Sequence, residues 1–133
     1  FGVRVASSMD VNRKKGGKIT NAEGLNDDAA WGTASPWVAY TGPVDGQTVG
    51  IALLTHPDSV RFPTIWHVRT YGLFAANPFG QSMFEKLPDK NAGDFTIPAG
   101  QSTTFRYRFY FHPGDTEKAK VAEHYSAYIS VVK

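Results

Sequence analysis

The strongest indication of fold in this sequence is an Asp45-Gly46 pair between two apolar runs, residues 37–40 and 48–55. An Asp-Gly pair readily adopts the positive φ angles that a two-residue hairpin turn requires. The 13 Gly and 8 Pro of the 133-residue chain recur at short intervals, which favours short strands and turns over helices. The sequence therefore predicts an all-β domain built from antiparallel hairpins.

Further strands are predicted where apolar and polar residues alternate, because successive side chains of a strand point to opposite faces. These strands cover residues 1–9, 18–21, 65–75 and 103–112. In the last of them the aromatic side chains, Phe109 and Phe111 included, share one face, which is typical of a strand covered by a core on that side. One helix is predicted near residues 115–128 from the spacing of its apolar residues. We expect an antiparallel β-sandwich with one C-terminal α-helix, and a single domain over residues 1–133.

Composition excludes several classes of protein. The absence of cysteine excludes disulfide scaffolds and cysteine-ligated metal sites. The 14 Lys and Arg against 12 Asp and Glu leave a net charge of +2. Apart from a basic cluster at 13–18, this charge is spread along the chain, so no nucleic-acid partner is expected. The longest apolar run, Val49–Leu54, is far below the roughly 20 residues that cross a bilayer, so no membrane span is expected.

The sequence contains no P-loop, dinucleotide-binding, nucleophile-elbow or zinc-protease motif, and it gives no reason to expect a cofactor. A group of polar residues remains. His67, Arg69 and Tyr71 alternate along one predicted strand and therefore share a face, and His56 ends the strand before it. Imidazole exchanges protons near neutral pH, guanidinium binds carboxylates and phenol donates hydrogen bonds. These residues indicate a site for a small polar ligand, and a solvated sheet face is the alternative.

Further candidate residues lie beside this strand. Glu23, in an acidic loop, is the best candidate for a general base or an acceptor of sugar hydroxyls. Trp66 and Asn77 are predicted ligand contacts, since aromatic rings pack well on the C–H faces of sugars. A different hypothesis is that His56 and His67 bind copper or zinc, because imidazole suits both metals.

Six segments carry a resemblance to a known family: residues 17–24, 30–32, 37–46, 50–52, 56–57 and 66–80. The stretch from Trp66 to Gly80 is the most specific of them. Together they resemble a bacterial family of uncharacterised proteins labelled PmoA-like, after a methane oxygenase subunit. Its members are longer and often exported. The resemblance implies that residues 1–133 are the C-terminal half of a longer precursor and that the protein is extracellular or periplasmic.

A second resemblance concerns residues 97–114, which are similar to the strand-turn-strand near the C-terminus of galactose-mutarotase-like β-supersandwiches. Those proteins bind or transform carbohydrates, and the enzymes among them pair a His acid with a Glu base. This resemblance implies His67 as the acid and Glu23 as the base, on half of a supersandwich.

Three hypotheses about function follow. In the leading one, the chain is an exported carbohydrate-binding or carbohydrate-active domain. Its proton-transferring pair is His67 and Glu23, and its ligand contacts are Arg69, Tyr71, His56, Asn77 and Trp66. In the second, it is a non-catalytic module that forms a homo-oligomer through unpaired β-edges. In the third, it is a mononuclear copper or zinc protein with His56 and His67 as ligands. The sequence does not decide between binding and catalysis.

Overall fold

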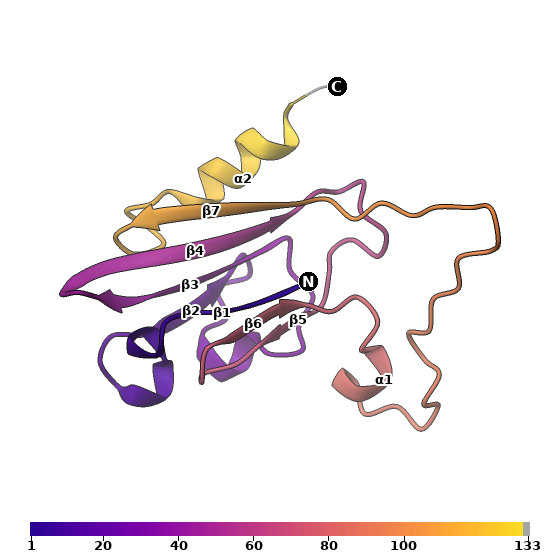
Figure 1. Ribbon diagram of the computed structural model, residues 1–133, viewed down its shortest axis with the longest axis horizontal. Helices are drawn as coiled ribbons and strands as arrows, with labels where there is room; N and C mark the ends of the chain where they lie inside the picture. Colours follow the sequence, from indigo (N-terminus) through magenta and orange to yellow (C-terminus); the bar gives the residue numbers. More distant parts are fainter. Residues whose placement is uncertain (132–133) are drawn as a thin grey trace.

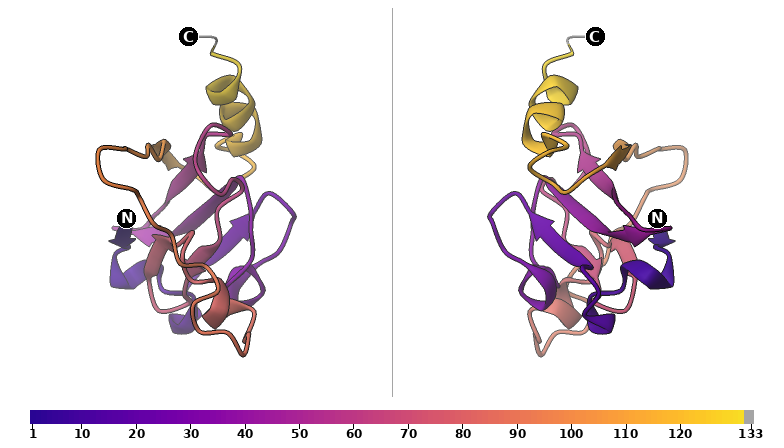
Figure 2. Two further views of the ribbon diagram at one scale, coloured as in Figure 1. Left: turned by 90° about the vertical axis from the view of Figure 1, so that its right-hand side faces the viewer. Right: turned by 90° about the vertical axis from the view of Figure 1, so that its left-hand side faces the viewer.

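The computed structural model describes residues 1–131 and consists of two antiparallel β-sheets packed face to face. In Figure 1 the smaller sheet lies below the larger one. A helix near the C-terminus lies on the other side of the larger sheet, away from the smaller one (Figure 2). The predicted fold class, an all-β antiparallel sandwich with one C-terminal helix, is therefore confirmed. Within the described residues, every helix is too short or too polar to span a lipid bilayer.

The larger sheet is built around the predicted hairpin. Its strands lie in the order β2-β3-β4-β7, with bounds Lys18–Asn21 for β2, Trp37–Val44 for β3, Gln47–Thr55 for β4 and Tyr107–Pro113 for β7. Strands β3 and β4 pair along their length, and Val44 lies opposite Gln47 at the turn. The φ angles are 48° at Asp45 and 78° at Gly46, the left-handed conformation that an Asp-Gly turn supplies.

The smaller sheet has the order β1-β6-β5. Its strands are β1 Gly2–Arg4, β5 Trp66–Val68 and β6 Leu73–Ala76. The prediction of one continuous strand over residues 65–75 was wrong, because the chain reverses between β5 and β6. The N–H of Arg69 donates to the C=O of Leu73 at 2.8 Å, and Gly72 has a φ of 95° that favours glycine.

Three short 3-10 helices connect the first strands: η1 Ser7–Met9, η2 Val11–Arg13 and η3 Asp27–Ala30. The strand predicted over residues 1–9 is therefore shorter than expected, because η1 takes its second half. In η1, the side chain of Met9 is buried and belongs to the main core. This segment closes one end of the sandwich.

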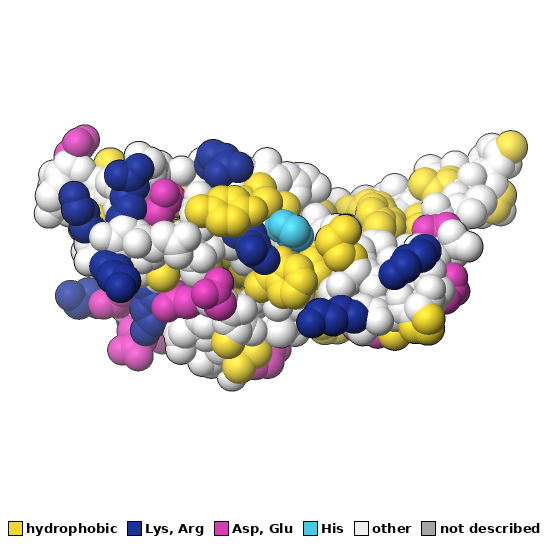
Figure 3. All heavy atoms as spheres, turned by 90° about the horizontal axis from the view of Figure 1, so that it is seen from below, with side chains coloured by type: hydrophobic (Ala, Val, Ile, Leu, Met, Phe, Trp, Pro, Cys, Tyr) yellow, Lys and Arg dark blue, Asp and Glu magenta, His cyan; other side chains and the backbone are white. Residues whose placement is uncertain are grey.

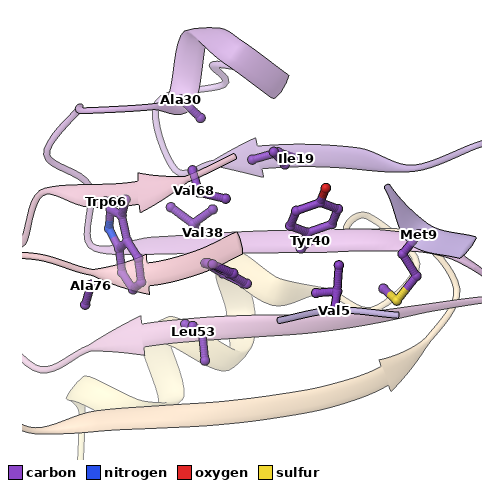
Figure 4. Close-up of a cluster of buried hydrophobic side chains, with 11 residues drawn as sticks. Val5, Met9, Ile19, Ala30, Val38, Tyr40, Leu53, Trp66, Val68 and Ala76 are labelled. Atoms are coloured by element: carbon purple, nitrogen blue, oxygen red, sulfur yellow. The ribbon is translucent and has the colours of Figure 1, made fainter. Parts of the chain in front are cut away.

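The main core fills the space between the two sheets (Figure 4). Trp66 and Phe74 enter it from the smaller sheet and Tyr40 and Leu53 from the larger, all with no exposed surface. The ring centre of Phe74 lies 5.8 Å from that of Trp66 and 6.1 Å from that of Tyr40. Trp66 donates its indole N–H to the C=O of Ser35 at 2.8 Å, so the polar atom of this buried side chain is satisfied.

The helix α2, Val121–Ile129, packs on the outer face of the larger sheet. Leu54 of β4 and Val121 of α2 belong to one buried cluster there, and Tyr110 of β7 donates its hydroxyl to the C=O of Ala119 at 3.1 Å. The helix begins later than predicted from residue 115. Lys120, just before it, has a left-handed φ of 50°, which a continuing α-helix does not allow.

Strand β7 extends beyond the part of the larger sheet that the smaller sheet covers. Phe109 is 42% exposed and Phe111 is 68% exposed. The alternation predicted for this strand is correct. The prediction that a core covers its aromatic face holds at Tyr107, which packs against the main core, and is wrong at Phe109 and Phe111, because β1 is the last strand of the smaller sheet on this side. The long connection between β6 and β7 contains a further short helix, α1 Gln81–Phe84, which was not predicted.

Truncation to alanine should affect stability differently at buried Phe74 and at exposed Phe111. Phe74→Ala should lower the free energy of unfolding by about 3–5 kcal/mol, because it leaves a cavity in the core. Phe111→Ala, the same chemical change at an exposed position, should change it by about 0.5 kcal/mol or less. Urea denaturation of both variants at one low protein concentration measures this. Equal losses would contradict the burial of Phe74 and the exposure of Phe111.

Candidate functional site

The predicted strand face that carries His67 lies on the outer side of the smaller sheet. Trp66, Val68 and Thr70 are buried, whereas His67 and Arg69 between them are half-buried. This is the alternation expected of an extended chain with one side on a core. The predicted site residues His67 and Arg69 therefore point away from the core, toward solvent. Tyr71 follows in the turn and is 43% exposed.

Arg69 lies between two aromatic rings. Its guanidinium carbon is 5.3 Å from the ring centre of Trp31 and 5.5 Å from that of Tyr71, within the range of cation–π attraction. Arg4 approaches Tyr71 in the same way at 5.8 Å. Among the ion pairs of residues 1–131, none involves Arg69. The guanidinium is thus positioned by stacking, and its charge has no carboxylate partner in the described part of the chain.

Two N–H groups at this place have no hydrogen-bond acceptor. They are Trp31 Nε1 and Arg69 Nε, both buried and both without a partner among the described residues. Leaving a buried donor unpaired costs about 1–3 kcal/mol, and native proteins avoid it at most positions. Two such donors on adjacent, stacked side chains indicate a place where an acceptor from outside the chain would be stabilised.

His67 lies next to this pair. Its ring centre is 6.1 Å from that of Trp31 and 5.8 Å from that of the buried Phe84 in α1. Burial, and secondarily the charge of Arg69, lowers the pKa of His67 below its ordinary value. The imidazole is therefore neutral at pH 7 and offers one N–H donor and one nitrogen acceptor.

The side chains of Trp31, His67, Arg69, Tyr71 and Phe84 are called the outer cluster below. Figure 3 views the molecule from the side of the smaller sheet and shows a histidine among hydrophobic side chains, with basic side chains beside them. An aromatic surface with a cation and a neutral imidazole can pack on an apolar ring face and bind oxygen atoms at its edge.

His56 is not part of the outer cluster. It follows β4, where its ring centre lies 5.2 Å from that of Tyr128 in α2. Its Nδ1 accepts the backbone N–H of Asp58 at 3.1 Å, and it is flanked by the carboxylate of Asp58 at 3.5 Å. Because α2 and the smaller sheet lie on opposite sides of the larger sheet, the structure does not bring His56 to His67.

Glu23 and Asn77 lie in turns beyond the strand ends. Glu23 is exposed, and its backbone N–H donates to Asn21 Oδ1 at 3.1 Å. Its carboxylate makes no ion pair or hydrogen bond with residues 1–131. Asn77 uses its Oδ1 to accept the N–H of Phe79 at 3.1 Å. Asn77 lies near Phe84, since a Cβ at Gly80 would meet both side chains. No described hydrogen bond or ion pair joins Glu23 to His67, so the predicted His67–Glu23 pair has no support from the geometry.

Trp66 is a core residue, which corrects its place among the predicted ligand contacts. It has no exposed surface and its indole N–H is satisfied. Trp31, and not Trp66, is the tryptophan whose ring lies beside that of His67. It directly follows η3, whose residues contact β5. The strand alternation already places Trp66 on the face opposite His67, but no local pattern in the sequence places Trp31 beside His67.

The structure also gives no support to a joint metal site of His56 and His67. Among the described residues, no three His, Asp or Glu side chains gather as they would to hold a metal ion. His67 is surrounded by aromatic rings and a cation, and neither supplies a ligand for copper or zinc.

The surroundings of His67 predict its titration. In Phe84→Ala the pKa of His67 should rise toward its ordinary value, because burial is the main cause of the low pKa, and in Arg69→Gln it should rise by a smaller amount. NMR titration of the His67 ring protons measures both. Arg108→Gln, a change at an arginine stacked on Tyr128 on the other side of the molecule, is the control. A pKa unchanged in all three variants would contradict the described surroundings.

Comparison with known proteins gives a family without an assigned function. The model of a family of unknown function, DUF6807, matches residues 1–126. No curated protein and no solved structure matches the chain. Because the match covers nearly all of the 133 residues, the chain belongs to the DUF6807 family.

Proposed function

We propose that this chain binds a carbohydrate that carries a carboxylate, such as a uronic acid, at the outer cluster. The observation that carries the proposal is Arg69, held between the rings of Trp31 and Tyr71 without an ion pair in the described part of the chain. A guanidinium fixed in this way has lost part of its freedom before a ligand arrives, so less entropy is lost when it binds a carboxylate.

The other side chains of the cluster suit the rest of a sugar. The exposed part of an indole packs on the C–H face of a pyranose ring. Neutral His67 both donates and accepts hydrogen bonds, which matches the hydroxyl groups of a sugar. The oxygen atoms of a bound sugar would supply acceptors for the unpaired N–H groups of Trp31 and Arg69.

The geometry favours binding over proton transfer. General acid–base catalysis needs both groups within hydrogen-bond reach of the substrate, and no described hydrogen bond or ion pair joins Glu23 to the outer cluster. We therefore propose a binding protein and leave the acid and base roles of His67 and Glu23 outside the proposal. A location outside the cytoplasm, which the resemblance to exported proteins implies, is compatible with such a ligand and remains a prediction.

Calorimetric titration with a uronic-acid oligosaccharide tests the proposal. Arg69→Gln should weaken binding about ten- to a hundredfold, because a charge-assisted hydrogen bond is worth about 1.5–3 kcal/mol. Reducing the carboxylates of the same oligosaccharide to alcohols should weaken its binding to the unaltered chain by a similar factor.

Arg108→Gln is the matched control, since Arg108 is also stacked on an aromatic ring, 4.2 Å from the centre of Tyr128. It should bind the ligand like the unaltered chain. If neither the acidic nor the reduced oligosaccharide binds, or if the two arginine variants weaken binding equally, the proposal is wrong.

A further inference from the structure

Strand β7 is an open edge of the larger sheet. It is the last strand in the order β2-β3-β4-β7. At its two ends, the C=O of Arg106 accepts the N–H of His56 at 3.0 Å, and the N–H of Gly114 donates to Thr48 at 2.7 Å. Since hydrogen bonding alternates along an antiparallel strand, the even-numbered residues pair with β4. The backbone N–H and C=O groups of Tyr107, Phe109 and Phe111 point to the other side, where the described residues provide no strand.

The same three residues present an aromatic surface. Their side chains lie on the inner face of the sheet, and Phe1 covers part of them, with its ring centre 4.5 Å from that of Tyr107 and 5.2 Å from that of Phe109. Phe111 is 68% exposed. The helix α2 lies on the outer face (Figure 2). The edge therefore offers unpaired backbone groups beside exposed aromatic rings, a combination that invites the addition of a strand.

Two largely apolar hollows lie beside residues of β7. One, of about 370 Å³, is next to Tyr107 and is lined by Phe1, Ala76, Pro78, Phe79, Phe105 and Tyr107. The other, of about 560 Å³, is next to Phe111, and Met9 and Ile51 also line it. A strand added to β7 would direct its inner side chains toward these hollows.

We propose that a second copy of this chain supplies the added strand, with the β7 strands antiparallel and Phe109 of both copies at the two-fold axis. Each Phe109 then exchanges its N–H and C=O bonds with the other, and Tyr107 pairs with Phe111 of the other copy. The result is one continuous sheet through both copies with an isologous interface. Pro113, which lacks an N–H, ends the pairing.

Charge and hydrogen bonding favour this register over the two neighbouring registers, which use the same backbone groups. With the axis at Arg108, two guanidinium groups would lie directly opposite each other, which is destabilising. With the axis at Tyr110, Tyr107 would lie opposite Pro113 and lose a hydrogen bond. With the axis at Phe109, Arg108 lies opposite the ring of Tyr110, a favourable cation–π arrangement, and no like charges meet.

The side chains on the inner face are also complementary. In this register the most exposed aromatic residue of β7, Phe111, lies opposite Tyr107 of the other copy, beside the smaller hollow. Tyr107 of the first copy likewise lies opposite Phe111 of the second copy, beside the larger hollow of that second copy. The exposed aromatic side chain of each copy therefore meets an apolar hollow of the other, and this fit does not depend on any ligand at the outer cluster.

Sedimentation equilibrium over a range of concentrations tests the dimer. Phe109→Pro removes an N–H that β4 does not use, and it should weaken the dimer about ten- to a hundredfold through the two hydrogen bonds lost at the axis. Ile97→Ser, which removes a side chain that is 48% exposed outside β7, should leave it unchanged. Circular dichroism checks that both variants fold. A chain that stays monomeric at all concentrations overturns the proposal, even if β7 binds a strand from a different protein.

Cysteine cross-linking tests the register independently of stability, because the chain has no cysteine of its own. Opposite residues of a hydrogen-bonded pair have Cα atoms about 5.5 Å apart, within disulfide range. Phe109→Cys should therefore form a disulfide-linked dimer under mild oxidation. Phe111→Cys should not, because each Phe111 lies opposite Tyr107 of the other copy, four residues along that strand from the other Phe111. Cross-linking of Phe111→Cys in place of Phe109→Cys would show a different register and contradict the proposal.

Discussion

The β3–β4 hairpin is buried on both faces, and the rest of the structure depends on it. Its inner face carries Tyr40 and Leu53 against the smaller sheet, and its outer face carries the small Ala52 and Leu54 under α2. All four have no exposed surface. Because both faces of the hairpin are buried, it contributes side chains to the main core and also to the cluster that packs α2 on the sheet. The tight Asp45-Gly46 turn keeps the two strands in register, so each face receives the intended set of side chains.

The candidate site is a consequence of this core. The indole of Trp66 is held between the sheets by its packing on Phe74 and by its hydrogen bond to Ser35. With Trp66 directed inward, its neighbour His67 must point outward, and Arg69 follows two residues later. On the outer face of the smaller sheet, Trp31 after η3 and Phe84 of α1 lie beside these side chains. The small size of this sheet also leaves the inner face of β7 uncovered at Phe109 and Phe111.

Much of this arrangement follows from local sequence patterns, and the errors come from contacts between distant residues. The Asp45-Gly46 turn and the shared face of His67 and Arg69 depend on neighbouring residues, and the structure has both. The exposure of Phe111 could not be predicted, because it depends on how many strands the opposite sheet contains. The reversal at Gly72 was missed because a strand and a tight hairpin share the same alternation on either side of the turn. Likewise, the position of Trp31 beside His67 depends on the long-range packing of η3 on β5.

The claim that the outer cluster binds a carboxylate can be tested most directly through the charge of His67. A carboxylate bound to Arg69 lies close to the imidazole and favours its protonated form. The pKa of His67, followed by NMR, should therefore rise when the chain is saturated with a uronic-acid oligosaccharide, and it should not rise with the same oligosaccharide after reduction of its carboxylates. An equal pKa of His67 with and without the acidic oligosaccharide, at concentrations that saturate any binding, would contradict the proposed site.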